Sequence, residues 1–407
     1  MLAERMIDAQ LRIRQLRSGT HALIDLDAYA RNIARLRAMA PGGAFMAVVK
    51  ADAYGHGAAI CGQAAIQAGA DMLGVARISE ALYLRAQGVT APILVLGPPS
   101  EGALADAISS GVTLAVGSER ALVAIEAAAG ASGMSATVHL KMDTGMRRYG
   151  FLSSEIVAIA ERLHASPLIE LEGVFTHFTS SDDLVDTSTP GQIDQFERVT
   201  DEIERLGMGL RYRHMANSAA ILRGQIGRSN LVRSGIATYG LSPSDEVPVD
   251  ERFEPIMSIR SVVARRFVVQ PGESVSYNQT FVADLSTQAA DIPIGYADGL
   301  PRNVSNIGWF VIDGERCPIL GRVCMDQVVA RTPDGVSEGA EVIILGSGCD
   351  GEMTYADAGR LAGTNNYEVA TRLMARVPRI YLRDGQPVAW EHLLEGDRGN
   401  CVPASMG

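Results

Sequence analysis

Short apolar runs alternate with segments of helical spacing through the first 250 residues or so. Continuous apolar runs are typical of parallel strands buried on both faces, and the intervening segments have the length of crossover helices. About eight such units predict a (β/α)8 TIM-type barrel, with a doubly wound sheet as the alternative. The predicted strands are Ala22–Leu26, Phe45–Val49, Leu73–Ala76, Ile93–Leu96, Val112–Val116, Val138–Met142, Leu171–Phe175, Tyr212–Met215 and Val232–Ala237.

The pattern changes after Glu254-Pro255, where stretches with a period of two follow. This period is typical of antiparallel strands with one buried face, and Asp313-Gly314 between two apolar segments predicts a tight hairpin. A late helix is expected from about Tyr355 to Met374. We therefore predict four parts: an N-terminal helical extension (1–20), a barrel (21–254), a C-terminal mainly antiparallel β domain (255–390) and a tail (391–407).

Composition narrows the class of protein. The 407 residues are 47% hydrophobic, enough to bury a sizeable core, and the net charge of −11 argues against nucleic acid or anionic lipid as a partner. The five cysteines lack CxxC spacing, so a structural zinc site is not indicated, and the apolar runs are too short to span a membrane. The first 20 residues predict an amphipathic helix rather than a signal peptide. These features favour a cytoplasmic protein that handles small molecules.

The segment Ala47–Gly57, AVVKADAYGHG, is the most informative stretch. An apolar strand ends in Lys50, which in a barrel places an ammonium group on the face where active sites lie. By residue type alone, Lys50 either pairs with Asp52 or another carboxylate, or forms a Schiff base with an aldehyde cofactor. No GxxxxGK[ST] or GxGxxG segment indicates a nucleotide.

Several widely separated motifs resemble the alanine racemase family, and the resemblance runs from Ile24 to Arg379. Besides AVVKADAYGHG they are LKMDTGM (140–146), THF (176–178), HMANSAA (214–220), VRSGIATYGLSPS (232–244), VSYNQTF (275–281), IPIGYADGLPR (292–302), GRVCMDQ (321–327) and NYEV (366–369). The resemblance implies a homodimer with shared active sites that interconverts L- and D-alanine with pyridoxal 5'-phosphate (PLP). Such an enzyme would supply D-alanine for peptidoglycan or serve the breakdown of L-alanine. The alternative is a racemase of the same fold with broader specificity.

The resemblance also implies two bases. Lys50 would hold PLP, which delocalises the charge left at Cα, and would serve the D-face proton. Tyr277 of the opposite subunit would serve the L-face proton. Both side chains ordinarily titrate near pH 10, so each needs a lower pKa, and the tyrosine needs nearby positive charge. His177, His214 or an arginine are candidate sources, although each histidine has a hydrogen-bonded structural role as its alternative.

Cofactor contacts follow from the same resemblance. Arg233 would donate to the pyridine nitrogen and keep it unprotonated, and His177 would lie near the ring. Asn217 or Ser218 is expected to cap a helix. The groups expected at the phosphate are Tyr54, Ser218, Gly235, Ile236 and Tyr367.

Substrate contacts are implied as well. Arg148 would contact the substrate carboxylate or orient the cofactor, and Met325, next to Asp326, would offer a backbone amide from the partner subunit. Lys141 would be a carbamate that fixes Arg148, or else an ordinary lysine paired with Asp143. Tyr296 and Arg302 would line the entrance or support Tyr277. Together with Tyr367, Tyr296 would narrow the entrance and favour a small side chain.

Two residues depart from the family pattern. Arg147 stands before Arg148 where glycine is usual, so spacing selects Arg148 as the inward guanidinium, and Tyr149 stands where leucine is usual. Other classes are disfavoured by the sequence. A decarboxylase of this barrel class would carry a Gly-rich phosphate loop, and a PLP carrier would lack the β domain. A structural protein would have no reason to cluster polar residues at strand ends.

Overall fold

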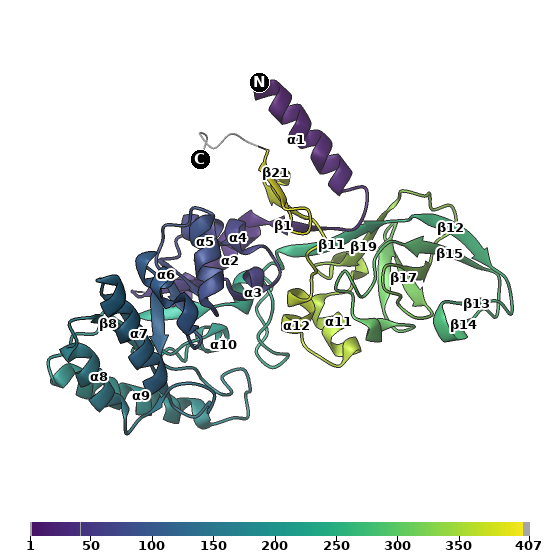
Figure 1. The fold of residues 1–407 in the computed structure, drawn as a ribbon. Helices are drawn as coiled ribbons and strands as arrows, with labels where there is room; N and C mark the ends of the chain where they lie inside the picture. Colours follow the sequence, from purple (N-terminus) through teal and green to yellow (C-terminus); the bar gives the residue numbers. More distant parts are fainter. Residues whose placement is uncertain (1, 41, 402–407) are drawn as a thin grey trace. The chain divides into compact units, whose positions relative to one another are not determined.

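The structure is a computed structural model that describes residues 2–40 and 42–401. The chain forms two compact units. The barrel unit comprises residues 29–54 and 58–253, and the sheet unit comprises the remaining parts, 1–28, 55–57 and 254–407. Figure 1 labels some of the elements of each unit. Within the described residues, no helix combines the length and the apolar character needed to cross a membrane.

The barrel unit is built on eight parallel strands in sequential order around a ring. The last strand pairs with the first, through the register Val232↔Phe45, which makes the ring nearly closed. This confirms the predicted (β/α)8 barrel over the doubly wound sheet. The strands are β2 (Ala44–Val48), β3 (Met72–Val75), β4 (Ile93–Val95), β5 (Thr113–Val116), β6 (Ala136–Asp143), β8 (Ile169–Phe175), β9 (Tyr212–His214) and β10 (Leu231–Ser234), with β7 (Phe151–Leu152) paired beside β6.

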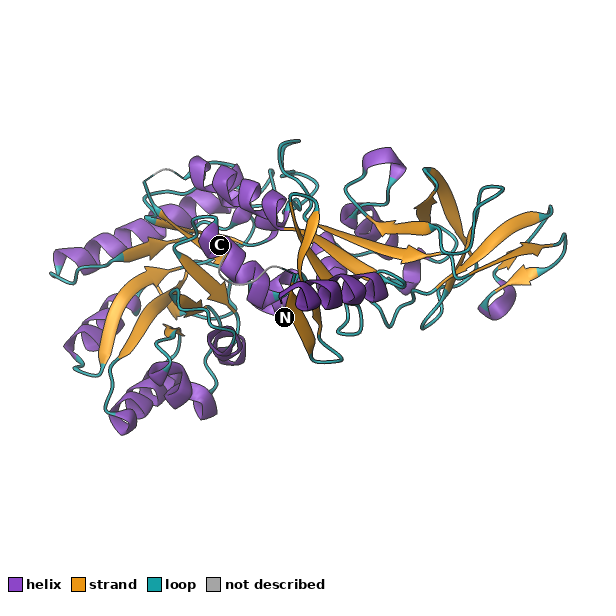
Figure 2. Ribbon diagram, turned by 90° about the horizontal axis from the view of Figure 1, so that it is seen from above, coloured by secondary structure: helices purple, strands orange, loops and turns teal. Residues whose placement is uncertain are grey.

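Helices lie outside these strands (Figure 2). Local chemistry sets their ends: the side chain of Ser118 accepts from Ala121 N at the start of α7, and Gly133 ends that helix with φ 66°. The segments are α2 (Leu26–Met39), α3 (Lys50–Tyr54), α4 (Ala58–Gln67), α5 (Ile78–Ala86), η1 (Glu101–Ala103), α6 (Leu104–Ser109), α7 (Glu119–Ser132), α8 (Ile156–Ala165), α9 (Ser188–Arg205), α10 (Ser218–Leu222) and η2 (Ile236–Tyr239).

The sheet unit contains an eleven-stranded sheet in which nearly all neighbouring strands are antiparallel, as predicted. Asp313-Gly314 makes the predicted hairpin, because Ile312 pairs with Glu315 and both turn residues have positive φ. A small separate ribbon, Val275↔Phe281, packs beside the sheet in a cluster with Val269 and Ala289. The strands are β11 (Met257–Val262), β12 (Arg265–Val269), β13 (Ser274–Val275), β14 (Phe281–Val282), β15 (Thr287–Ile292), β16 (Trp309–Ile312), β17 (Glu315–Leu320), β18 (Val328–Arg331) and β19 (Glu341–Leu345).

The remaining elements of this unit are helices and strands from near the two ends of the chain, together with short 3₁₀ segments. They are α1 (Leu2–Leu16), β1 (His21–Asp25), η3 (Tyr277–Gln279), η4 (Arg302–Val304), η5 (Cys349–Gly351), α11 (Tyr355–Ala362), α12 (Asn366–Thr371), β20 (Arg379–Arg383), β21 (Gln386–His392) and β22 (Asp397–Asn400).

One predicted barrel strand lies in the other unit. The run Ala22–Leu26 corresponds to β1, which pairs with β11 in antiparallel and with β20 in parallel orientation. Buried and partly buried residues alternate from Ala22 to Asp25, and Leu23 packs against Ile13 and Leu16 of the N-terminal helix. An apolar run shows that a strand is buried but not which partners bury it, so the predicted start of the barrel at residue 21 was wrong for this strand.

Two other predictions near the C-terminus need correction. The single helix predicted from about Tyr355 to Met374 is two helices, because Gly363 takes φ 72° and ends α11. The predicted tail is an ordered hairpin through residue 400, in which β21 pairs with β22. It is tied to the N-terminal helix by an ion pair of 2.7 Å between Arg12 and Asp397. Residues 402–407 of that predicted tail lie outside the described residues.

Candidate active site

Lys50 follows β2 at the carboxyl end of the barrel, as its position in the sequence predicts. The next four residues, 51–54, all have φ between 51° and 55°, a left-handed turn that non-glycine residues adopt at a cost of about 1–2 kcal/mol each. The Glu80 carboxylate helps to hold this turn by accepting from Ala51 N at 2.6 Å. Strain of this kind is concentrated at functional sites, where the surroundings hold it in place.

The charge environment of Lys50 favours a neutral amine. Partial burial, and then the charge of Arg148, lower the pKa of Lys50, while Glu80 opposes them. The expected alternative, a pairing with Asp52, has less support, since the Asp52 carboxylate accepts from Ala58 N at 2.8 Å. Lys50 is therefore placed to act as a nucleophile or base rather than as half of that ion pair.

Arg233 is buried in the barrel, with 4% of its surface exposed. Its Nη2 donates to the carbonyls of Thr176 and Met215 at 2.7 and 2.9 Å, and its Nη1 donates to His214 Nδ1 at 2.9 Å. Burial lowers the pKa of Arg233 to about 9, which leaves it a cation at neutral pH. The guanidinium of Arg233 can only donate hydrogen bonds, so at this buried position it can face an acceptor atom of a ligand.

A chain of hydrogen bonds continues from Arg233 across the barrel. Because His214 Nδ1 accepts from Arg233, its Nε2 carries the proton and donates to His139 Nδ1 at 2.7 Å. His139 Nε2 in turn donates to Glu172 at 3.1 Å, and Glu172 also pairs with Arg211 at 2.9 Å. Each imidazole is thus confined to one neutral tautomer between a cation and a carboxylate.

The two predicted histidines are neutral. Burial, and then the charge of Arg233, hold the pKa of His177 and of His214 well below the ordinary range. The expectation that an imidazolium here supplies positive charge to the tyrosine base is therefore wrong, and the arginines remain as the charged groups. Desolvation decides the protonation state, because an uncharged imidazole loses less solvation free energy on burial than an imidazolium does.

Lys141 lies on β6 and is also buried, with its ammonium 4.6 Å from the centre of the Phe175 ring. Burial, then Arg233 and Arg148, lower the pKa of Lys141 to about 7, against the opposing charge of Asp143. Lys50 and Lys141 are the two lysines of the whole chain. Their rarity is visible in the sequence and singles out both side chains.

A cluster of neutral donors lies where β10 ends. Asn217 caps α10 by accepting from Ala220 N at 3.0 Å, which decides between the two predicted caps. The hydroxyl of Ser218 accepts from Gly235 N at 3.0 Å, and a Cβ on Gly235 would lie 2.4 Å from the Tyr54 hydroxyl. Hydroxyls and backbone amides thus converge around a glycine, next to the buried Ile236, which is the donor set that suits a phosphate group.

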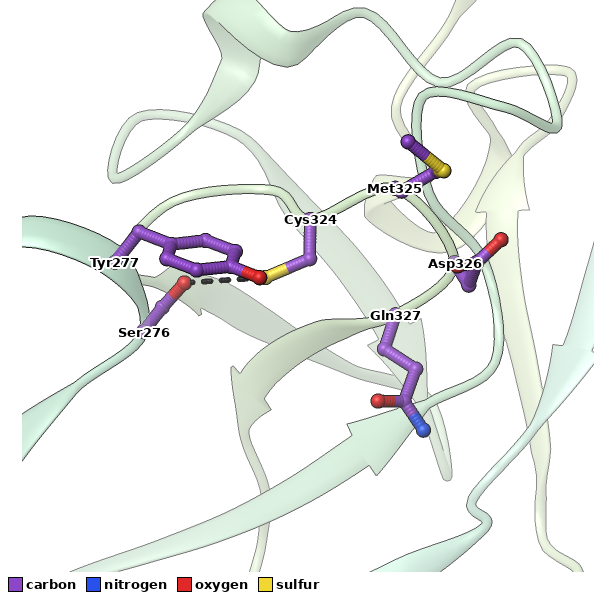
Figure 3. Close-up of a pocket in the computed structure, with 6 residues that line it drawn as sticks. All are labelled: Ser276, Tyr277, Cys324, Met325, Asp326 and Gln327. Atoms are coloured by element: carbon purple, nitrogen blue, oxygen red, sulfur yellow. Dashed lines mark hydrogen bonds between the residues drawn. The ribbon is translucent and has the colours of Figure 1, made fainter.

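The sheet unit carries the other predicted residues. Tyr277 stands between β13 and β14 and is 66% exposed. A cavity of about 330 Å³ is lined by Tyr277, Met325, Asp326 and their neighbours Ser276, Cys324 and Gln327. Figure 3 shows the ring of Tyr277 beside Cys324, whose sulfur lies 3.3 Å from the Ser276 hydroxyl. The structure thus brings together two residues, Tyr277 and Met325, that are 48 positions apart.

An ion-pair cluster supports the wall of this cavity. Arg376 binds the buried Asp298 carboxylate through two nitrogens, at 2.6 and 2.9 Å, and binds Asp326 at 2.7 Å. The backbone of Tyr296 donates to Cys324 O at 3.1 Å, which fastens the turn carrying Tyr296 to the Met325 loop. Neither Arg376 nor Asp298 was singled out in the sequence, because their separation along the chain hides their contact.

The other predicted residues are more peripheral. Tyr367 lies in the first turn of α12 and is partly buried, and Arg302 is exposed at the start of η4. His139, Glu172 and Thr176 were missed. The period of two along β6 is a signal that could have found His139, since it lies two residues before Lys141 and so faces the same side of the strand.

The α/β-barrel carries an accessible lysine, buried cations and a phosphate-type donor cluster at its strand ends. These features define an enzyme that acts on small molecules. Two family models match the chain: the alanine racemase N-terminal domain over residues 24–243 and the C-terminal domain over residues 256–381. The chain belongs to the alanine racemase family, whose members are amino-acid isomerases.

Named relatives agree with these matches. The chain is 41% identical over 369 residues to an alanine racemase of Thermobifida fusca, covering 89% of this chain and 98% of the relative. An alanine racemase from Streptomyces lavendulae has a crystal structure with a TM-score of 0.85 at 39% identity, covering 90% of this chain and 97% of the other. An alanine racemase of Bacillus anthracis with bound L-Ala-P gives 0.86 at 35% identity, covering 93% and 98%.

Proposed function

We propose that this chain interconverts L- and D-alanine with PLP held at the barrel mouth. The observation that carries the proposal is Lys50, an accessible lysine with a lowered pKa at a barrel strand end, in a chain with one other lysine. The hydroxyls of Tyr54 and Ser218 and the amide of Gly235 fit the phosphate, and Ile236 and Tyr367 would complete that set. Arg233 would face the ring nitrogen, since it donates and cannot accept a proton.

PLP supplies an aldehyde that binds the substrate amine and a ring that delocalises the negative charge left when the Cα proton departs. The chain's own residues move that proton. Lys50 would exchange it on one face of Cα and Tyr277 on the other, while Arg148 would bind the carboxylate and Met325 would offer its backbone amide. The lowered pKa of Lys50 favours the neutral amine, which is the form that can accept the proton.

The test of this proposal is the interconversion of optically pure alanine with added PLP. We expect either enantiomer to approach a one-to-one mixture, with serine and lysine turned over far more slowly, because a small substrate pocket discriminates by size. Comparable turnover of serine or lysine would instead favour the broader-specificity racemase. Alanine that stays optically pure in the presence of PLP would reject both.

We also propose that two copies of the chain share their active sites. Tyr277 and Met325 are 66% and 52% exposed, which suits residues that serve a neighbouring chain rather than their own core. Mixing inactive Lys50→Ala chains with inactive Tyr277→Phe chains should then restore activity. At equal amounts about a quarter of the wild-type rate is expected, because half of the dimers pair one intact site with one doubly defective site. Absence of any recovery after subunit exchange would contradict a shared site.

We propose further that Lys141 is carbamylated. Its neutral amine would add to carbon dioxide with release of a proton, giving an anion near two arginines. Since the pKa of Lys141 is lowered to about 7, the reactive amine should be abundant above pH 7 and scarce below it. With ¹³C-bicarbonate we expect a carbamate NMR signal that grows as the pH rises through 7. One carbamate resonance of the wild type should be missing in Lys141→Ala, and a spectrum of Lys141→Ala that keeps every carbamate resonance of the wild type would refute the assignment.

A cytoplasmic location is part of the same proposal. The described cysteines are Cys61, Cys317, Cys324, Cys349 and Cys401, and they form no disulfide with one another. Reduced cysteines fit the cytoplasm better than an oxidising compartment.

A further inference from the structure

The segment between β6 and β7 makes a short excursion at the mouth of the barrel. The chain leaves β6 after Asp143 and returns beside it, because Phe151 pairs with Met142. Three positions take a positive φ within this segment: Gly145 at 150°, Arg147 at 53° and Gly150 at 133°. A Cβ on Gly150 would lie 3.0 Å from Asp143 N, so the returning chain is packed closely against the strand it left.

Tyr149 ties this excursion to a different strand. Its hydroxyl accepts from Gly117 N at 2.9 Å and donates to Ala115 O at 3.1 Å, both at the carboxyl end of β5. Burial raises the pKa of Tyr149 to about 12, so the hydroxyl remains a donor over the physiological range. The Tyr149 hydroxyl therefore satisfies one backbone N–H donor and one backbone carbonyl acceptor of the barrel wall.

The barrel leaves space for this ring. A Cβ on Gly117 would lie 2.7 Å from the Tyr149 ring, closer than real contacts allow. Gly117 is followed by Ser118, which caps α7, so the ring is held against a segment that is itself fixed. The leucine usual at this position in the family would fill part of this space but could make neither hydrogen bond.

Arg148 lies between the left-handed Arg147 and the anchored Tyr149. Its side chain is exposed at the barrel mouth, and its charge lowers the pKa of Lys50, Lys141 and His177, which places it among the groups of the site. When the backbone is fixed on both sides of a flexible arginine, its guanidinium is restricted to fewer positions.

We propose that Tyr149 is a positioning residue that holds Arg148 at the barrel mouth, where the guanidinium binds the carboxylate of the amino-acid substrate. The proposal rests on the proposed function for the identity of that substrate. It accounts for one of the two departures from the family pattern, because Tyr149 replaces leucine as an anchor. The other, Arg147, takes a left-handed turn that the usual glycine would adopt with less strain.

The test uses the full chain with PLP and the variant Tyr149→Phe, which keeps the ring and removes the hydroxyl. We expect the KM for alanine to rise about tenfold and kcat to change less than about twofold, the pattern of lost ground-state binding. Arg148→Gln should raise KM at least as much, and the double variant should be no worse than Arg148→Gln alone. Arg120→Gln, which removes an exposed arginine outside this segment, is the control and should keep the wild-type KM. Wild-type KM in Tyr149→Phe, or additive losses in the double variant, would overturn the proposal.

A second measurement needs neither PLP nor racemisation. In the cofactor-free chain the pH dependence of Lys50 modification by an amine reagent reports its pKa, and peptide mapping separates Lys50 from Lys141. We expect Tyr149→Phe to shift the midpoint upward toward that of Arg148→Gln, since a displaced Arg148 no longer opposes the ammonium. An unchanged midpoint would count against the proposal, whatever the substrate proves to be. Should Tyr149→Phe fail to fold, Gly117→Ala, which displaces the ring, carries the same two measurements.

Discussion

Replacing Lys50 with alanine is expected to reduce racemisation of alanine in both directions by at least about 10³-fold. In the proposed function the loss removes a general base, whose contribution is typically about 10²–10⁴-fold, and also the amine that would bind the cofactor. Reduction with borohydride in the presence of PLP should no longer label this position. Initial rates from both enantiomers and peptide mapping of the reduced protein measure the two effects.

The chain offers clean controls for this prediction. Because Lys50 and Lys141 are its two lysines, label found in Lys141→Ala must lie on Lys50 or on the N-terminal amine. Lys50→Arg keeps a positive charge but cannot release a proton near neutral pH, so it should be as inactive as Lys50→Ala. Substantial activity in Lys50→Arg would mean that charge, and not proton transfer, is what Lys50 contributes. Label that stays at the wild-type amount in Lys50→Ala would reject Lys50 as the attachment point.

Replacing Tyr277 with phenylalanine is expected to lower racemisation by about 10²–10⁴-fold, because one of two bases is lost. The overall rate must fall equally from L- and D-alanine, since the equilibrium between enantiomers does not change. Exchange of the Cα hydrogen with solvent deuterium is not bound by that equality. We expect exchange from D-alanine, which Lys50 serves, to persist while exchange from L-alanine falls with racemisation.

The same variant tests where Tyr277 acts. It is 66% exposed and its ring remains in phenylalanine, so the fold and the binding of PLP should be unchanged. We therefore expect Tyr277→Phe to keep the PLP content and the thermal unfolding of the wild type while deuterium exchange from L-alanine falls. Equal loss of deuterium exchange from both enantiomers would contradict the two-base assignment, even if racemisation itself were slow.

Much of the fold was predictable from periodicity. Eight of the nine apolar runs form the barrel in sequential order, because strands buried on both faces need continuous apolar side chains. The hairpin at Asp313-Gly314 followed from turn chemistry alone. The ninth run, β1, was misplaced because its partners β11 and β20 lie more than 230 residues away, and partner choice is not encoded locally.

The site was predictable only in part, for a related reason. Lys50 and the neighbours of Gly235 stand in motifs whose local pattern indicates their chemistry. The protonation states of His177 and His214 do not follow from sequence, because they depend on the depth of burial and on Arg233 nearby. The roles of Tyr149 and Arg376 are likewise invisible there, since each acts through a contact with residues 32 or more positions away.

The amino-acid sequence by itself determined the order of the barrel strands, the position of Lys50 at a strand end and the change to an antiparallel unit, because these depend on local periodicity and on which residue follows a buried strand. The tertiary structure decided which sheet takes β1, which histidine tautomers form between Arg233 and Glu172, and which barrel strand the Tyr149 hydroxyl contacts. Those outcomes depend on desolvation and on contacts between distant segments, which exist only once the chain has folded.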